Sequence, residues 1–134
     1  MKIGKKEVNF FKNLSGDKNL IHTSRKFAKN FFFKEPIVHG VDLAIRGICK
    51  FLKKKKNNII IDQIKINFKN FTCIDENFKI HVKKNKVIIS NALNTKIEID
   101  ISFRKSKNDI DSLKKNLGHF KKYNYKNLIN SEII

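Results

Sequence analysis

The chain has little cysteine and no long hydrophobic run, and each shortage excludes a class of protein. Cys49 and Cys73 are its only cysteines; they lie far apart and form no CxxC pair, so they indicate neither a disulfide framework nor a zinc site. No apolar stretch is long enough to cross a bilayer, and the first twenty residues contain no signal-peptide core. We therefore expect free thiols in a soluble, cytoplasmic protein.

Arginine is also scarce, although the chain is strongly basic. It carries 30 basic and 12 acidic residues, a net charge of +18, but only three of the basic residues are arginines: Arg25, Arg46 and Arg104. Bidentate recognition of bases and phosphates favours arginine, whereas lysine gives non-specific attraction. We expect no specific nucleic-acid partner, and non-specific binding through the lysine-rich surface remains the weaker alternative.

The length and composition are those of one α+β domain. A chain of 134 residues, 40% of them hydrophobic and twelve of them phenylalanine, has enough apolar surface for a single core. Helical spacing of apolar residues predicts a helix over residues 6–14, a second that begins at Thr23 or Ser24 and ends before Pro36, and a long third helix over about 40–52. The third has the broadest apolar face.

After this helix the apolar period changes to two, which predicts half-exposed strands. Alternation is clearest over residues 64–68, 78–82 and 97–103, and a further strand is expected over 86–92. Such closely spaced strands form antiparallel neighbours, and the long helix needs a sheet to bury it. We predict a domain over 1–108 and a basic C-terminal extension over 109–134, partly helical, whose apolar residues pack on the domain or fray more readily than they bind a membrane.

One segment carries a recognisable motif. It runs from Phe11 through Ser15-Gly16-Asp17-Lys18-Asn19-Leu20-Ile21-His22 to Ala28 and then Pro36-Ile37-Val38-His39-Gly40. This pattern resembles the signature of the MaoC-like, (R)-specific enoyl-CoA hydratase family: an aromatic, SGDxNPxH, an alanine and PIxHG. The resemblance implies a hot-dog fold, in which an antiparallel sheet wraps around the long central helix.

Asp17 and His22 are the candidate catalytic pair. They lie five residues apart across a loop and can converge on one water molecule, because imidazole exchanges a proton near neutral pH while the carboxylate accepts the second hydrogen. Alone, either residue is more typical of a turn or a loop. The family resemblance implies that the water adds to a trans-2-enoyl thioester and gives an (R)-3-hydroxyacyl product, with dehydration as the reverse.

The remaining motif residues have supporting roles in this hypothesis. Ser15, Gly16 and Asn19 are expected to shape the catalytic loop. Gly40 begins the long helix, where its free N–H can bind the developing thioester oxyanion. His39, Val41 and Asp42 are assigned to the acyl pocket or the turn, with His39 more typical of a packed residue than of a proton donor. His81 and His119 have no candidate catalytic residue near them in the sequence. The four histidines are scattered and do not have the spacing of metal ligands.

The sequence departs from the family pattern at three places. Leu20 replaces the usual proline and removes a constraint on the loop. Asp42 replaces an apolar residue; it either pairs with Arg46 one turn on or makes the acyl pocket polar. The short N-terminus leaves little room for the strand that relatives place before the first helix.

The resemblance also implies a homodimer and an acyl thioester substrate, carried by coenzyme A or by an acyl carrier protein, with no further cofactor. The lysine surplus suits either anionic carrier. Two alternatives keep the fold and change the activity: a non-catalytic subunit that binds acyl thioesters, and a thioester hydrolase.

Overall fold

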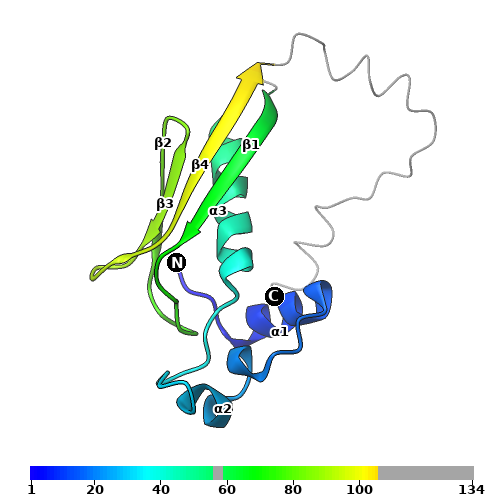
Figure 1. Cartoon of the computed structure of the whole chain (residues 1–134), viewed down its shortest axis with the longest axis vertical. Coiled ribbons are helices and arrows are strands. Elements are labelled where there is room, and N and C mark those ends of the chain that lie inside the picture. Colours follow the sequence, from blue (N-terminus) through cyan, green and yellow to red (C-terminus); the bar gives the residue numbers. More distant parts are fainter. Residues whose placement is uncertain (56–58, 106–134) are drawn as a thin grey trace, which may run out of the picture.

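The computed structural model describes residues 1–55 and 59–105, so the predicted C-terminal extension lies outside the described residues (Figure 1). The elements follow one another as α1 (Lys5–Ser15), the short 3-10 turn η1 (Leu20–His22), α2 (Arg25–Lys29), α3 (Gly40–Lys54), β1 (Ile59–Phe68), β2 (Lys79–Lys83), β3 (Lys86–Ser90) and β4 (Thr95–Lys105). The helices and strands predicted within these residues are all present.

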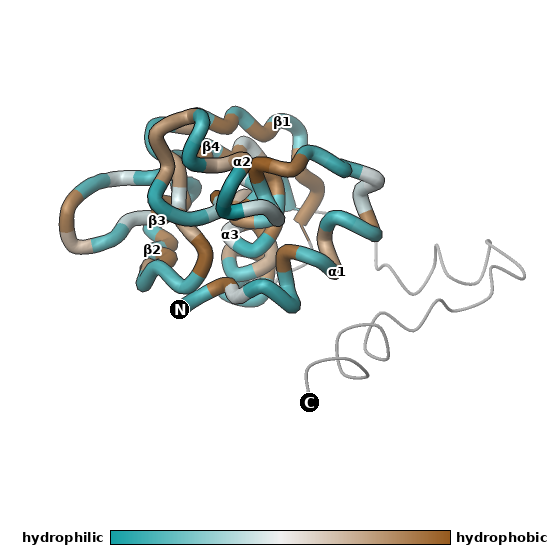
Figure 2. The backbone as a smooth tube through the Cα atoms, turned by 90° about the horizontal axis from the view of Figure 1, so that it is seen from below, coloured by the Kyte–Doolittle hydropathy of each residue, from teal (hydrophilic) through white to brown (hydrophobic). Residues whose placement is uncertain are grey.

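A four-stranded antiparallel sheet wraps around α3. The strand order is β1-β4-β3-β2, and seen from below the strands curve around the helix (Figure 2). A side chain at Gly47 would lie 3.1–3.3 Å from Val87, Ile99 and Ile89, so glycine lets the helix approach the sheet closely. This arrangement confirms the predicted α+β architecture and the hot-dog fold.

The core fills the space between the sheet and the helix. Its buried apolar residues come mainly from α3 and from the inward faces of β3 and β4, and include Leu43, Ala44, Phe51, Val87, Ile89, Ile97, Ile99 and Ile101. On β4 the inward residues alternate with Glu98 and Asp100, which are partly exposed. Period-two patterning therefore gave the correct face of this strand.

The second helix ends earlier than Pro36 requires. Ser24 caps it by accepting a hydrogen bond from the N–H of Phe27 at 3.2 Å. The helix stops at Lys29, because the carbonyl of Ala28 accepts the N–H groups of both Phe31 and Phe33 and closes a turn. Phe32 lies in that turn at φ 65.

The two edges of the sheet differ. On the β2 side, Lys50 and Lys54 of α3 each donate to a strand carbonyl, of Ile80 and Val82, at 2.8 Å. No strand precedes α1 in the described residues, although Met1 and Phe78 exchange backbone hydrogen bonds at 2.7 and 2.9 Å. The other edge, β1, pairs with β4 alone among the described strands.

A buried polar network, here called the Glu76 network, ties the loop before β2 to β4. Lys96, only 5% exposed, places Nζ 2.8 Å from Glu76 Oε1. The other Glu76 oxygen accepts the N–H of Cys73 at 2.8 Å, and Asn91 donates to Oε1. Burial alone would raise the pKa of Glu76, but the bonds from Lys96, Cys73 and Asn91 outweigh it and lower the pKa.

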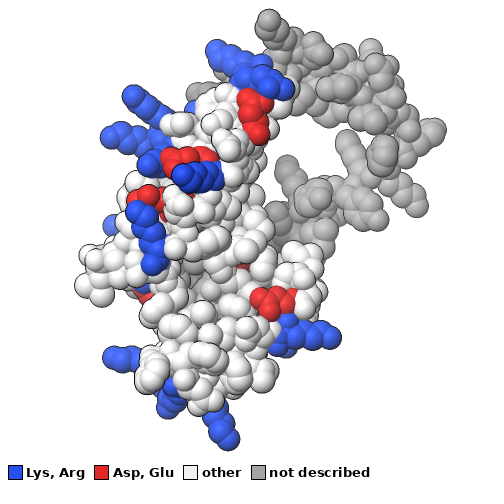
Figure 3. Space-filling view, in the orientation of Figure 1, with Lys and Arg blue, Asp and Glu red and all other residues white. Residues whose placement is uncertain are grey.

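Two further expectations concern the thiols and the charged surface. Both cysteines are free, as predicted. Among the described residues, no helix is long and apolar enough to span a bilayer. On the face in Figure 3 the basic side chains are scattered and several stand beside acids, which is the distribution of a solvated surface more than of one nucleic-acid groove.

Candidate active site

The loop after α1 is shaped by residues of the motif. Gly16 adopts φ 74, a left-handed conformation that glycine tolerates without strain, and it ends α1. Ser15 Oγ donates to the carbonyl of Phe11 at 2.8 Å and accepts the N–H of Asp17 at 3.2 Å. The chain therefore turns sharply just before Asp17.

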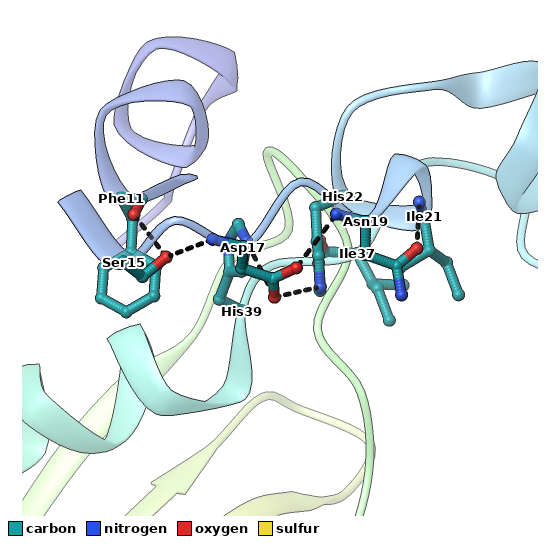
Figure 4. Close-up of polar contacts among 8 residues, drawn as sticks. All are labelled: Phe11, Ser15, Asp17, Asn19, Ile21, His22, Ile37 and His39. Carbon is teal, nitrogen blue, oxygen red and sulfur yellow. Dashed lines mark hydrogen bonds and ion pairs between the residues drawn. The ribbon is translucent and has the colours of Figure 1, made fainter. Parts of the chain in front are cut away.

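Asn19 holds the next part of this loop. Its N–H donates to Asp17 Oδ1 at 3.0 Å, and its own Oδ1 accepts the N–H of Ile21 at 3.1 Å, which caps η1. Asn19 thereby fixes one oxygen of Asp17 and leaves Oδ2 to face His22 (Figure 4). The placement of Ser15, Gly16 and Asn19 fits the supporting role expected of them.

His22 is oriented by a backbone carbonyl. Its Nδ1 lies 2.8 Å from the oxygen of Ile37, so Nδ1 carries the proton and, in the neutral ring, Nε2 is left as the basic nitrogen. Nε2 lies 3.5 Å from Asp17 Oδ2. The structure thus brings together the two residues that the motif singled out, with the basic atom of the imidazole facing the carboxylate.

His39 completes the group in a way that the sequence did not indicate. Its ring stacks on that of His22, with centroids 3.7 Å apart and planes inclined by 23°, and Phe11 packs against its ring at 5.0 Å. Its Nε2 lies 3.7 Å from the same Asp17 Oδ2. We refer to Asp17, His22 and His39 as the site cluster.

His39 is buried. The residue is 3% exposed, and among the described residues neither ring nitrogen has a hydrogen-bond partner. Burial, and then the nearby His22, lower the pKa of His39 against the opposing effect of Asp17 and Asp42. His39 is therefore held in the neutral form more strongly than an exposed histidine.

The site cluster has the residue types of a metal site but not the geometry. Three possible ligand atoms lie within 4.8 Å of one another, which the spacing of the histidines did not predict. Imidazole lone pairs lie in the ring plane, and two nearly parallel stacked rings direct them side by side instead of toward one ion. The arrangement suits a shared proton better than a metal.

The Pro36–Val38 segment brings His39 to this position. It runs between η1 and the loop before β2: the Ile37 N–H donates to Ile21 O at 3.2 Å, and the Val38 N–H donates to Thr72 O at 2.8 Å. The carbonyl of Pro36 accepts the N–H of Ile74 at 2.9 Å. The PIxHG part of the motif is thus fixed from both sides, with His39 at the N-cap of α3.

A cavity of about 300 Å³ opens beside His22. Its lining is mostly apolar and comprises His22, Ile37, Val38, Gly40, Leu43, Phe68, Lys69, Asn70, Phe71, Thr72 and Ile97. Gly40 is the first residue of α3, so its N–H has no acceptor within the helix. A Cβ there would lie 3.0 Å from the Phe68 ring, so glycine admits that ring to the cavity wall.

Val41 and Asp42 do not line this cavity. Val41 is 56% exposed on the outer side of α3. Asp42 is buried, but its Oδ1 accepts a 2.9 Å hydrogen bond from Arg46 Nε one turn later. The ion pair considered from the sequence is therefore present, and neither residue makes this cavity polar.

The far wall of the cavity was not predicted from the sequence. Phe68 ends β1, Phe71 and Thr72 follow it along the chain, and all three are distant in sequence from the motif. The alternating pattern predicts which face of the strand Phe68 lies on, but it does not predict which part of the molecule that face contacts. The Ile37–Cys73 bridge, a tertiary contact, places these residues opposite His22.

Solved structures with a similar fold include known hydratases. The R-hydratase PhaJ1 from Pseudomonas aeruginosa, in the unliganded form, aligns with a TM-score of 0.64 at 18% identity, covering 81% of this chain and 77% of that one. The (R)-hydratase from A. caviae involved in PHA biosynthesis gives 0.61 at 19%, covering 79% and 90%. A protein from Archaeoglobus fulgidus gives 0.64 at 18%, covering 78% and 72%.

The sequence itself was compared with curated proteins and with family models. No curated protein matches it significantly. The model of the MaoC like domain matches residues 1–96, which include α1, the site cluster, the central helix and most of the sheet. The chain belongs to the MaoC-like domain family.

Proposed function

We propose that the protein is an (R)-specific enoyl thioester hydratase, which also catalyses the reverse dehydration. The observation that carries this proposal is the convergence of Asp17 Oδ2 and His22 Nε2, 3.5 Å apart, at one side of an apolar cavity whose lining includes His22 and Gly40. Family membership supports a reaction of this class. A base, a second acceptor, an oxyanion donor and an acyl pocket are the groups that such a hydration needs.

The reaction follows from these positions. A water molecule beside the pair gives one proton to His22 Nε2, while Asp17 Oδ2 accepts a hydrogen bond from its other hydrogen. The water oxygen adds to the β carbon of the enoyl group, and negative charge moves to the thioester oxygen, where the Gly40 N–H can stabilise it. The imidazolium of His22 then protonates the α carbon, giving a neutral 3-hydroxyacyl thioester.

The cavity supports an acyl group as the part of the substrate that is held. Ile37, Val38, Leu43, Phe71 and Ile97 give it apolar walls, which gain free energy by covering hydrocarbon. Coenzyme A and an acyl carrier protein are both proposed as carriers. The cytoplasmic location and the independence from any further cofactor stay predictions of the sequence.

The test is turnover of purified protein with a short and a medium-chain trans-2-enoyl-CoA. Loss of the conjugated thioester absorbance, with (R)-3-hydroxyacyl-CoA as product, is the expected result, and Asp17→Asn should reduce the rate by about 10²–10⁴-fold. Release of free thiol would identify a thioester hydrolase instead. Binding of both substrates without turnover would favour the non-catalytic subunit.

We further propose that the chain forms a homodimer through the β1 edge. Ile60, Ile64 and Phe68 of β1 are 43%, 39% and 56% exposed, and α3 adds exposed Val41, Ile45 and Leu52. An open strand edge with exposed apolar side chains favours strand pairing. Light scattering should give twice the chain mass for wild type and a monomer for Ile64→Lys; a monomeric wild type would contradict the proposal.

A further inference from the structure

His39 is the one member of the site cluster to which the proposed mechanism gives no task. It lies between two rings, with Phe11 of α1 against one part of its surface and His22 stacked on it at 3.7 Å. His22 also lines the cavity, whereas His39 does not. His39 thus packs on the face of the His22 ring from a position outside the cavity lining.

We propose that His39 is a positioning residue for His22: its neutral ring forms a rigid backing that keeps the His22 imidazole in the plane where Nε2 faces Asp17. The inference rests on the proposed function for its catalytic consequence. Its structural part concerns the protein without substrate and can be tested independently of turnover.

Contact with the His39 ring is needed because only one other strong interaction, a hydrogen bond, fixes the orientation of the His22 ring. The hydrogen bond from Nδ1 to the carbonyl of Ile37 holds one edge of the ring, so tilting of the ring about the Cβ–Cγ bond is opposed by that single bond. The 3.5 Å separation from Asp17 is too long to act as a second hydrogen bond. Contact with the face of His39 also opposes this tilting, and misplacement by about 1 Å can cost about 100-fold in rate.

Neutrality of His39 is part of the same role. The titratable groups that face it are His22 of η1, Asp17 of the loop after α1 and Asp42 of α3, and Asp42 is already paired with Arg46. A cation on His39 would repel the imidazolium that His22 forms during the reaction. Burial and His22 lower the pKa of His39, which keeps the backing ring uncharged when His22 takes the proton.

The first experiment follows the ring nitrogens of the free protein by ¹⁵N NMR over a pH series. The His39 signals, assigned by their loss in His39→Phe, are expected to report a neutral ring at pH 6.5, where half of an unperturbed histidine population would be protonated. A His39 ring that is half-protonated at pH 6.5 or above would overturn the proposal. The readout needs no substrate, so it stands even if the protein proves not to be a hydratase.

The second experiment uses substitutions at His39 to distinguish the contribution of the flat ring from that of its nitrogen atoms. His39→Phe keeps a flat ring and should retain kcat within about threefold, whereas His39→Ala should lower kcat by about 10–100-fold with KM little changed. His39→Asn keeps a polar nitrogen without a ring and should resemble His39→Ala. Rescue by Asn and not by Phe would show that His39 acts through a hydrogen bond from its nitrogen instead of through its ring, and would overturn the positioning role.

His81 provides the matched control. It is an exposed histidine on β2, and His81→Phe should change neither kcat nor the titration of His39. If His39→Ala fails to fold, His39→Phe and the NMR series still decide the question. In that case a fall in kcat for His39→Phe to the level of His39→Asn contradicts the proposal.

Discussion

Two of the buried polar side chains among the described residues, His39 in the site cluster and Lys96 in the Glu76 network, have different hydrogen-bonding surroundings. In the Glu76 network both carboxylate oxygens accept hydrogen bonds, from Lys96, Cys73 and Asn91. In the site cluster both nitrogens of His39 lack a hydrogen-bond partner among the described residues, and Asp17 Oδ2 faces two imidazoles at 3.5 and 3.7 Å.

The two groups of residues differ in role: the Glu76 network stabilises the fold, whereas the site cluster belongs to the proposed active site. A buried polar group with all its bonds made can fix a loop at little net cost, whereas an unsatisfied one costs free energy that the fold must offset elsewhere. The Glu76 network is accordingly a structural clamp on the cavity wall. In the site cluster, Asp17 Oδ2 and His22 Nε2 lie 3.5 Å apart, too far for a direct hydrogen bond, so both atoms can bind the water molecule of the proposed reaction.

Changing one carboxylate to its amide in each place gives the largest expected contrast. Asp17→Asn removes the anion of the site cluster and should lower kcat by about 10²–10⁴-fold while changing stability little, because Asp17 is 43% exposed. Glu76→Gln leaves Lys96 buried without its anion and should cost about 3 kcal/mol of unfolding free energy. Turnover assays and urea unfolding of both variants check this; a stability loss in Asp17→Asn as large as in Glu76→Gln would remove the distinction.

Two asparagines offer a matched pair of smaller changes. Asn19 caps η1 in the catalytic loop, and Asn91 Oδ1 accepts the N–H groups of Leu93 and Asn94 in the turn before β4. Asn19→Ala should cost about 1 kcal/mol because it removes the cap of η1, and Asn91→Ala should cost at least as much because it removes the turn bonds together with the hydrogen bond to Glu76 Oε1. Only Asn19→Ala should also lower kcat, since Asn19 orients Asp17; equal kcat values in the two variants would argue against that role.

The smallest expected effect is a difference in the pH dependence of stability. Because the pKa of His39 is lowered from 6.5, the unfolded chain binds a proton that the folded chain does not. The contribution of neutral His39 to stability is therefore complete above pH 6.5 and is lost progressively as the pH drops toward the folded pKa. His39→Phe should remove this loss.

The Glu76 network gives the comparison at lower pH. The pKa of Glu76 is lowered from 4.5, so its contribution is present above that pH and is lost as pH falls through the folded pKa. The free energy of unfolding, measured in urea at a series of pH values, should therefore differ increasingly between wild type and His39→Phe as the pH falls below 6.5. The unfolding free energy of Glu76→Gln should approach that of wild type only below pH 4.5. Divergence of His39→Phe that begins only below 4.5 would mean that His39 is not held neutral by burial.

Much of the fold could be predicted from the residues alone. The periods of the apolar residues determined the helices and strands, since burial of one face is a local pattern that the sequence displays. The local turns around Ser15, Gly16 and Asn19 could be predicted as well, because turns and caps are short-range structures with their own residue preferences, whereas Asp17 and His22 were singled out by the resemblance to the family motif. The end of α2 was missed, as the turn that follows Ala28 has no proline or glycine to mark it.

What only the tertiary structure decided is which of these residues come together. The segment Pro36–Val38 pairs with residues 72–74, and this contact places His39 under His22 and sets the Phe68, Phe71 and Thr72 wall opposite the catalytic loop. Sequence spacing reports which residues share a face of one element, but it carries no information about which faces meet. The loop over residues 15–22 was therefore determined by the sequence locally, whereas the cavity beside it and the stacked pair of histidines depend on long-range packing.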